Sequence, residues 1–238
     1  NTYVNRSMIG AVVGVQPFGG TGLSGTGPKA GGPHYLMRFA TERTLTINTA
    51  AMGVDPDLHP LNSAGQVIGS SERVLGEAYG GETAWMYDAA HGTVATGLTD
   101  AVHTASSGLQ YGQPLKLSES GLAVGYSRRY SGNTQIGQSG WFFDMDSGVT
   151  TPLVFSTRSD GFALTTPTVL TESGWVLGSY NLYSGSTLLG ANGFLWSLDK
   201  GFTDLGGLVN GGLSSFGWSV LSSVSAANEF TTIVGQGK

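Results

Sequence analysis

The stretch "LSESGLAVGYS" from Leu117 to Ser127 decides the fold, because closely related stretches stand on either side of it. "LNSAGQVIGSS" begins 56 residues earlier, at Leu61, and "LTESGWVLGSY" begins 53 residues later, at Leu170. Each stretch contains two glycines in the spacing G-x-x-x-G. Self-similarity at a period of about 50 residues is typical of repeat architectures.

Further features recur at fixed distances from the second glycine of each stretch. An aromatic residue stands 16 positions after it, at Trp85, Trp141 and Phe194, and a glycine follows 7 positions later in every unit. A glycine at such a position is typical of a turn between strands. After Ser225 the stretch "AANEFTTIVGQG" repeats the first element, which indicates the start of a fourth unit.

The pattern predicts three short strands in each unit, separated by glycine turns. In the second unit they would be "LAVGYS", "SGWFFD" and "VTTPLV". One such sheet cannot bury both faces alone, so neighbouring units are expected to stack. The predicted fold class is mainly β, an incomplete β-propeller-like repeat of three to four blades. Its units are expected near residues 61–116, 117–169 and 170–224, with a partial unit at 225–238.

Residues 61–238 resemble the HAF-type extracellular β repeats. Units of that type combine an asparagine-glycine turn, "G-x-V-x-G", a small residue before an aromatic-Leu-Trp sequence, and "D-L-G-x-L". The third unit matches best, with "GFLWSLDKGFTDLGGLVNGG" from Gly193 to Gly212. The first two units lack the "DLGGL" ending. The resemblance implies a fold and names no ligand.

Composition narrows the classes of function. The formal net charge of the 238 residues is −5, which gives no indication of a nucleic-acid or anionic-membrane partner. The chain has no cysteine, so disulfides, cysteine-ligated zinc and a thiol nucleophile are excluded within it. No apolar run approaches the length of about 18 residues that a transmembrane helix requires. We therefore expect no membrane partner.

The first 53 residues carry a literal G-x-G-x-x-G, from Gly20 to Gly25. A dinucleotide-binding fingerprint requires a helix directly after these glycines, because the helix N-terminus binds the pyrophosphate. Here "TGPKAGGPH" follows, and its prolines and glycines do not sustain a helix. A P-loop is excluded as well, since Gly27 is followed by Pro28 and not by lysine. No cofactor-binding residue is predicted in this chain.

The same stretch resembles the C-terminal end of an aldehyde dehydrogenase. "PFGGTGLSGTGPKAGGPHYLMRF" from Pro17 to Phe39 and "TERTLTINTAAMG" from Thr41 to Gly53 are similar to the subfamily that oxidises glutamate γ-semialdehyde, also known as 1-pyrroline-5-carboxylate dehydrogenase. The resemblance extends to the version in the bifunctional proline-utilisation enzyme. The resemblance covers residues 1–53, and "VDPDLHP" at residues 54–60 reads as a linker.

The resemblance implies a substrate-binding role for Gly10, Ala11 and Phe18. Backbone amides near Gly10 and Ala11 would hold the α-carboxylate of the substrate, and the Phe18 ring would form a wall of the aldehyde tunnel. Converging N–H groups suit a carboxylate, and glycine permits their close approach. Thr21 departs from the acidic residue expected after "PFGG".

The resemblance also implies that the catalytic parts lie elsewhere. The nucleophilic cysteine of the family is absent here, and its general base and NAD-binding domain would precede residue 1. We therefore expect a fragment of the dehydrogenase that has no catalytic residues, no bound NAD and no substrate of its own. The alternative is a non-enzymatic, secreted or periplasmic β-repeat protein with a binding or structural role, in which residues 1–53 are a chimeric join. The first predicts the cytoplasm and the second the periplasm or the cell exterior.

Other residues of chemical interest favour structural roles. The four histidines do not fall at metal-ligand spacings, so they are expected to be solvated or to cap turns. "DMDSG" from Asp144 to Gly148 lacks the glutamate that completes a calcium loop and indicates a turn. No "G-x-S-x-G" supports a Ser-His-Asp triad. The recurring aromatic pairs predict packing between units rather than a sugar-binding rim; they are Trp85 and Tyr87, Trp141 and Phe143, and Phe194 and Trp196.

Overall fold

The computed structural model describes residues 18–20, 23, 29–30, 61–229 and 232–238. The chain divides into two units, Asn1–Ile47 and Asn48–Lys238, and each is described by itself. The linker predicted at 54–60 and the boundary predicted at residue 53 lie outside the described residues.

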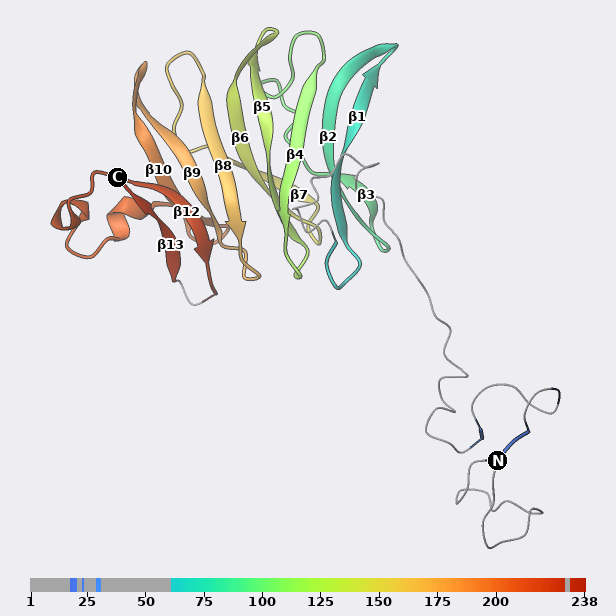
Figure 1. The fold of residues 1–238 in the computed structure, drawn as a ribbon. Helices are drawn as coiled ribbons and strands as arrows, with labels where there is room; N and C mark the ends of the chain where they lie inside the picture. The colour runs from blue at the N-terminus through green and yellow to red at the C-terminus, as the bar shows by residue number, and fades with distance from the viewer. Residues whose placement is uncertain (1–17, 21–22, 24–28, 31–60, 230–231) are drawn as a thin grey trace, which may run out of the picture. The chain divides into compact units, whose positions relative to one another are not determined.

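The structural unit Asn48–Lys238 consists almost entirely of β-strands, as the sequence predicts (Figure 1). The strands and the two 3₁₀ helices are β1 (Val67–Leu75), β2 (Ala78–Asp88), β3 (Gly92–Ala95), β4 (Gln110–Leu117), β5 (Leu122–Ser131), β6 (Thr134–Asp144), β7 (Val149–Leu153), β8 (Ala163–Leu170), β9 (Val176–Ser184), β10 (Thr187–Ser197), β11 (Gly201–Asp204), η3 (Leu205–Leu208), η4 (Leu213–Phe216), β12 (Leu221–Ala227) and β13 (Ile233–Gly237).

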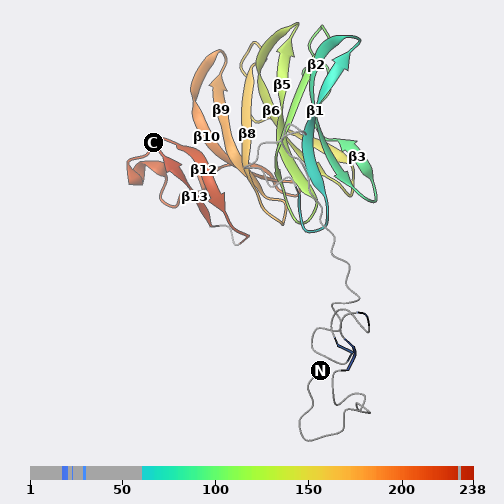
Figure 2. The same ribbon diagram turned by 45° about the vertical axis from the view of Figure 1, so that its right-hand side comes forward.

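The repeat period of the sequence is visible in the strand pairing. Strands β4 to β7 form one antiparallel group and β8 to β11 another, while β1 to β3 form a group of three. Short parallel ladders join β2 to β4 and β6 to β8, so that the three groups make one mixed sheet of 11 strands. Strands β12 and β13 form a separate antiparallel pair beside β10 (Figures 1 and 2).

A mainly β fold is thus confirmed, with a large mixed sheet. Within the described part of the chain no sheet closes on itself. The arrangement of the units as propeller-like blades therefore stays a prediction.

The sequence analysis missed three strands, β4, β8 and β12. Strands β4 and β8 lie at the ends of the units expected at 61–116 and 117–169, whereas in the structure they pair with β5 and β9 of the units that follow. Strands β4 and β8 precede the strands that the glycine pattern predicted, and each contains a proline, Pro114 or Pro167. A proline within an apolar run argues against a central strand, because it cannot donate a hydrogen bond to the ladder. The structure accommodates each proline at a shift of register against the next strand.

Two glycines allow successive groups to join. Gly81 in β2 and Gly137 in β6 both have φ of +99°, a conformation that L side chains rarely adopt. A Cβ atom at Gly81 would lie 1.6 Å from the carbonyl oxygen of Gln110, and one at Gly137 would lie 1.9 Å from that of Ala163. Only glycine allows the first strand of the next group to approach this closely.

The hydrophobic core consists of three clusters, each between successive groups of strands. The first contains Met86 of β2 and Trp141 and Phe143 of β6. The second contains residues of β5 to β7 and of β9 and β10, including Phe194 and Trp196. The predicted packing of these two aromatic pairs is confirmed, since all four side chains are buried.

The aromatic pair of the first group behaves differently from the other two. Trp85 is half-buried, and Tyr87 is 41% exposed. Among the described residues no group of strands precedes β1, so this face lacks the partner that buries the equivalent pairs in β6 and β10.

The third cluster lies between the third group and the β12–β13 pair. Its buried members are Leu177 of β9, Leu205 of η3 and Val224 of β12.

No described helix is both long and apolar enough to cross a membrane.

Candidate functional site

Of the predicted substrate-binding residues, Phe18 is described, whereas Gly10 and Ala11 lie outside the described residues. Phe18 and Ala30 form an antiparallel bridge: the N–H of Phe18 donates to the carbonyl of Ala30 at 3.0 Å, and the N–H of Ala30 donates back at 2.9 Å. The Lys29 ammonium group donates to the carbonyl of Gly20. The bridge therefore brings the two ends of the glycine-rich stretch together, and the Phe18 side chain is 37% exposed.

A polar cluster that the sequence analysis did not predict lies within the structural unit Asn48–Lys238. The Nδ1 atom of His103 lies 2.8 Å from the Asp100 carboxylate, and its Nε2 atom lies 2.8 Å from the hydroxyl of Ser139 on β6. The same hydroxyl accepts a hydrogen bond from the guanidinium group of Arg129, on β5, at 3.0 Å. Aspartate, histidine and serine thus form a connected chain of side chains.

Burial determines the electrostatics of this cluster. His103 is 3% exposed and Ser139 is fully buried. Burial lowers the pKa of His103 below its ordinary value, and its hydrogen bond to Asp100 opposes that shift without cancelling it. The imidazole is accordingly neutral at pH 7. The sequence analysis expected the histidines to be solvated or to cap turns, and His103 is buried. His91 is more exposed and contacts Asp88 at 2.9 Å.

The cluster contains the residue types of a hydrolase triad without the geometry that such a reaction requires. A nucleophilic hydroxyl must reach a substrate carbonyl, and fully buried Ser139 has no access to one. The residues 53 positions after His103, Arg129 and Ser139 are serine, leucine and asparagine, so the cluster does not recur at the repeat period. We conclude that these side chains, which come from both sides of the boundary expected between the first two repeat units, satisfy one another and play a structural role.

Turns between strands are joined across successive units by glutamates. The Ser63 N–H donates to the Glu119 carboxylate at 2.7 Å, and the Ser120 N–H donates to that of Glu172 at 3.0 Å. A third contact of the same kind joins Ser173 to Glu229, with its hydroxyl donating at 2.5 Å. These contacts recur at the repeat period, so the carboxylates form a ladder along one edge of the stacked units.

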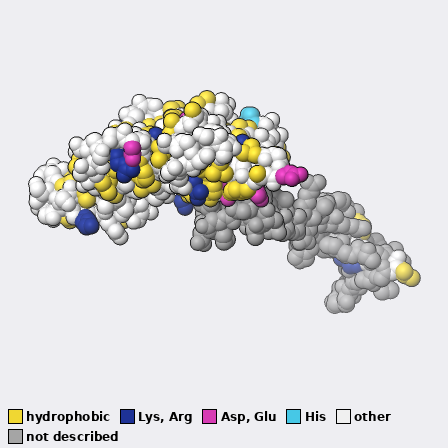
Figure 3. Space-filling model, turned by 90° about the horizontal axis from the view of Figure 1, so that it is seen from above, with side chains coloured by type: hydrophobic (Ala, Val, Ile, Leu, Met, Phe, Trp, Pro, Cys, Tyr) yellow, Lys and Arg dark blue, Asp and Glu magenta, His cyan; other side chains and the backbone are white. Residues whose placement is uncertain are grey.

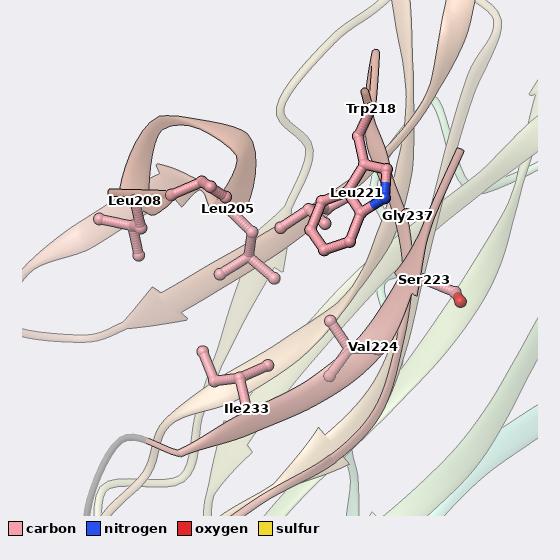
Figure 4. Close-up of a pocket in the computed structure, with 10 residues that line it drawn as sticks. Leu205, Leu208, Trp218, Leu221, Ser223, Val224, Ile233 and Gly237 are labelled. Atoms are coloured by element: carbon pink, nitrogen blue, oxygen red, sulfur yellow. The ribbon is translucent and has the colours of Figure 1, made fainter. Parts of the chain in front are cut away.

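An apolar cavity of about 440 Å³ lies between the third unit and the β12–β13 pair. The side chains of Leu205, Leu221, Val224 and Trp218 converge on it, whereas Ser223 points away (Figure 4). The remaining lining residues are Leu208, Val209, Ile233, Gly235 and Gly237.

The "DLGGL" sequence of the third unit builds one wall of this cavity. The Asp204 carboxylate caps η3 by accepting from the N–H of Gly206 at 2.8 Å, and it also accepts from the hydroxyl of Tyr180 at 2.7 Å. Burial, followed by the contact with Asp204, raises the pKa of that tyrosine. The capped turn directs Leu205 and Leu208 toward the cavity.

Other parts of the surface offer fewer features. Charged side chains are few and scattered on the face shown in Figure 3, with apolar and uncharged groups between them. Among the described residues no group of three or more histidine, cysteine, aspartate or glutamate side chains could hold a metal ion.

Comparison with known proteins gives partial matches. The bifunctional protein PutA of Salmonella typhimurium is 62% identical over 65 residues, which cover 24% of this chain and 5% of PutA. PutA of Klebsiella aerogenes is 77% identical over 43 residues, or 18% of this chain and 3% of that protein. The mitochondrial Δ1-pyrroline-5-carboxylate dehydrogenase of Mus musculus is 49% identical over 53 residues, or 22% of this chain and 9% of that protein.

These matches support an aldehyde dehydrogenase segment of about 60 residues in the chain. Their lengths are close to the 53 residues that the sequence resemblance covers. The chain spans about 5% of the length of the PutA protein of Salmonella typhimurium. No family model and no solved structure matches the chain, so the resemblance of residues 61–238 to HAF-type repeats stays a prediction.

The two features that sequence reasoning missed differ in the signal they leave. The spacing Asp100-x-x-His103 is a weak local indication of a hydrogen-bonded pair, but Ser139 lies 36 residues further on. The "DLGGL" motif marks one wall of the cavity, but no motif joins that wall to the others, which come from β12, β13 and the segment that contains Trp218.

Proposed function

We propose that residues 1–53 are the C-terminal segment of an NAD-dependent dehydrogenase of proline catabolism, which oxidises glutamate γ-semialdehyde. The observation that carries this proposal is the 62% identity to PutA over 65 residues. In the complete enzyme the segment would hold the substrate, with the backbone amides near Gly10 and Ala11 on its α-carboxylate and the Phe18 ring beside its aldehyde end. The half-exposed ring of Phe18 is compatible with such a wall.

The chemistry itself would come from other parts of the enzyme. Oxidation of an aldehyde by this route requires a thiolate and a hydride acceptor, and this chain has no cysteine. The prolines and glycines that follow the G-x-G-x-x-G do not sustain the helix whose N-terminus binds a pyrophosphate. We therefore propose no role for residues of this chain in binding NAD, and we assign it a positioning function.

A segment exchange tests this proposal. The matched 65 residues of Salmonella typhimurium PutA are replaced by the corresponding segment of this chain, and NADH formation from 1-pyrroline-5-carboxylate is followed. We expect the exchanged enzyme to keep its activity. Phe18→Ala should then lower kcat/KM about tenfold, which corresponds to about 1.4 kcal/mol. Leu23→Ala is the matched control, since Leu23 is fully exposed. A folded but inactive exchange protein, or equal effects of the two variants, would contradict the proposal.

For residues 61–238 we propose a non-enzymatic β-repeat module whose units stack as blades of an open propeller. The hydrophobic clusters between successive groups of strands support this stacking. The second candidate function is a secreted or periplasmic binding or structural protein to which residues 1–53 are joined as a chimera. Sequencing coverage across residues 50–60 in the source genome distinguishes the two, because a chimera predicts a break there.

A further inference from the structure

In the first three units a glycine of one strand faces an aromatic residue of the next. The pairs are Gly69 with Trp85, Gly125 with Trp141, and Gly178 with Phe194. In each pair the aromatic ring lies against the glycine backbone. A Cβ atom added to the glycine would lie between 2.3 and 2.9 Å from the nearest ring atom. The glycine therefore provides the space that the ring fills.

The β12–β13 pair repeats the first half of this arrangement. Its turn begins at Asn228, whose side chain accepts from the N–H of Thr232, as that of Thr171 accepts from Trp175. Gly235 stands as far after Asn228 as Gly178 stands after Thr171. It is thus the equivalent of the glycine that faces an aromatic residue in the other units.

The second half of the arrangement is missing from the described residues. A Cβ atom at Gly235 would lie 2.2 Å from the carbonyl oxygen of Ser223, as one at Gly178 would lie 2.1 Å from that of Thr166. No aromatic ring atom is among its nearest neighbours, in contrast to Gly178 and Phe194. Within the described ranges no strand pairs with β13 apart from β12. The apolar cavity lies here, and Gly235 is one of its lining residues.

We propose that the free edge of β13 and this cavity bind an extended segment of another polypeptide, which adds to the sheet as an antiparallel strand. Its aromatic side chain would lie over Gly235, and a second one, two residues further on, would contact the wall formed by Leu205 and Leu208. The partner is defined by its chemistry: a strand with the order small, aromatic, apolar, aromatic. The three earlier units accept strands of this kind.

Three properties of the site support this occupant. An unpaired edge strand offers backbone N–H and C=O groups that an added strand can satisfy, while pockets for alternate side chains provide specificity. The cavity volume of about 440 Å³ falls within the range of ligand pockets, about 300–1,000 Å³. Its side chains are almost all apolar, which favours aromatic groups over charged ones.

A peptide titration of the full 238-residue chain tests the proposal. The probe is a synthetic peptide with the sequence of Thr187–Asp199, "TLLGANGFLWSLD", which carries the required pattern. We expect saturable, micromolar binding by isothermal titration calorimetry. We also expect the amide signals of Gly235 and Gly237 to shift in NMR spectra. The peptide with the change F194A should bind at least tenfold more weakly, and a scrambled peptide should not bind.

Two variants of the chain locate the binding site. Leu208→Glu places a charge on the cavity wall and should weaken binding at least tenfold; Leu208 is 56% exposed, so the fold should tolerate the change. Leu198→Glu is the control, since Leu198 is 68% exposed and does not line the cavity. No binding, equal binding of the scrambled peptide, or equal effects of the two variants would overturn the proposal. A concentration-dependent dimer that Leu208→Glu abolishes, without peptide binding, would assign the site to a second copy of the chain and overturn it as well.

Discussion

Trp141 offers the sharpest test of packing between the first two units. Its side chain is fully buried, and it lies over Gly125 while contacting the cluster that includes Met86. Replacement of a fully buried tryptophan by alanine removes its contacts and leaves a cavity, which costs about 3–5 kcal/mol. We therefore expect Trp141→Ala to lower the free energy of unfolding by that amount, a large part of the roughly 5–15 kcal/mol of a typical domain.

Trp141→Phe is the matched comparison, because the third unit has Phe194 at the equivalent position. The smaller ring loses about 1–2 kcal/mol of apolar contact. The indole Nε1 atom of Trp141 is buried without a hydrogen-bond partner, and its removal recovers about 1–3 kcal/mol. The two terms nearly cancel, so we expect a change within about 1 kcal/mol.

Urea unfolding followed by far-UV circular dichroism measures both variants. An unchanged m-value would show that they unfold from the same structure. A loss below about 1 kcal/mol for Trp141→Ala, or equal losses for the two variants, would refute the packing described for the first cluster.

Further predictions address close approach, pH and activity. Gly69→Ala should destabilise the chain, and Trp85→Ala should relieve most of that loss in a double-mutant cycle, because the three atoms nearest to an added Cβ all belong to the Trp85 ring. Trp141→Ala should not relieve Gly125→Ala, since a backbone carbonyl also crowds that position; equal coupling at the two sites would contradict this account. Because burial lowers the pKa of His103, the unfolded chain takes up a proton first as the pH falls. Stability should thus be fully present above about pH 6.5 and decrease below it. His103→Gln should flatten this dependence between pH 7.5 and 5.5 in urea titrations, and an unchanged slope would argue against it. The purified chain should form no NADH from NAD and glutamate γ-semialdehyde, and any formation above a blank would refute its catalytic incompleteness.

The sequence predicted those parts of the fold that depend on local pattern. Glycine and aromatic spacing identified the paired strands, because a ring over a backbone requires glycine opposite it, as at Gly125 and Trp141. The same reasoning missed β4 and β8, where a proline argues against a strand and a shift of register accommodates it. The parallel ladders between units depend on Gly81 and Gly137, whose sequence context does not reveal a positive φ.

The candidate sites were less accessible to sequence reasoning, for two physical reasons. The His103 cluster depends on contacts across 36 residues, which no spacing rule predicts. The cavity lies beside the β12–β13 pair, where no further described strand pairs with β13 as β10 pairs with β9. It therefore depends on how strands are arranged and not on any single residue. For the dehydrogenase segment the opposite holds: the motif around Phe18 predicted an aldehyde dehydrogenase segment, which the partial matches support, while Gly10 and Ala11 lie outside the described residues.

The rate of 1-pyrroline-5-carboxylate-dependent NADH formation by the exchanged PutA enzyme tests the central claim most directly. With the segment of this chain in place, the account predicts activity within tenfold of the parent enzyme and a decrease of about tenfold in kcat/KM for Phe18→Ala but not for Leu23→Ala. A folded enzyme without activity, or one that Phe18→Ala leaves unchanged, would contradict it.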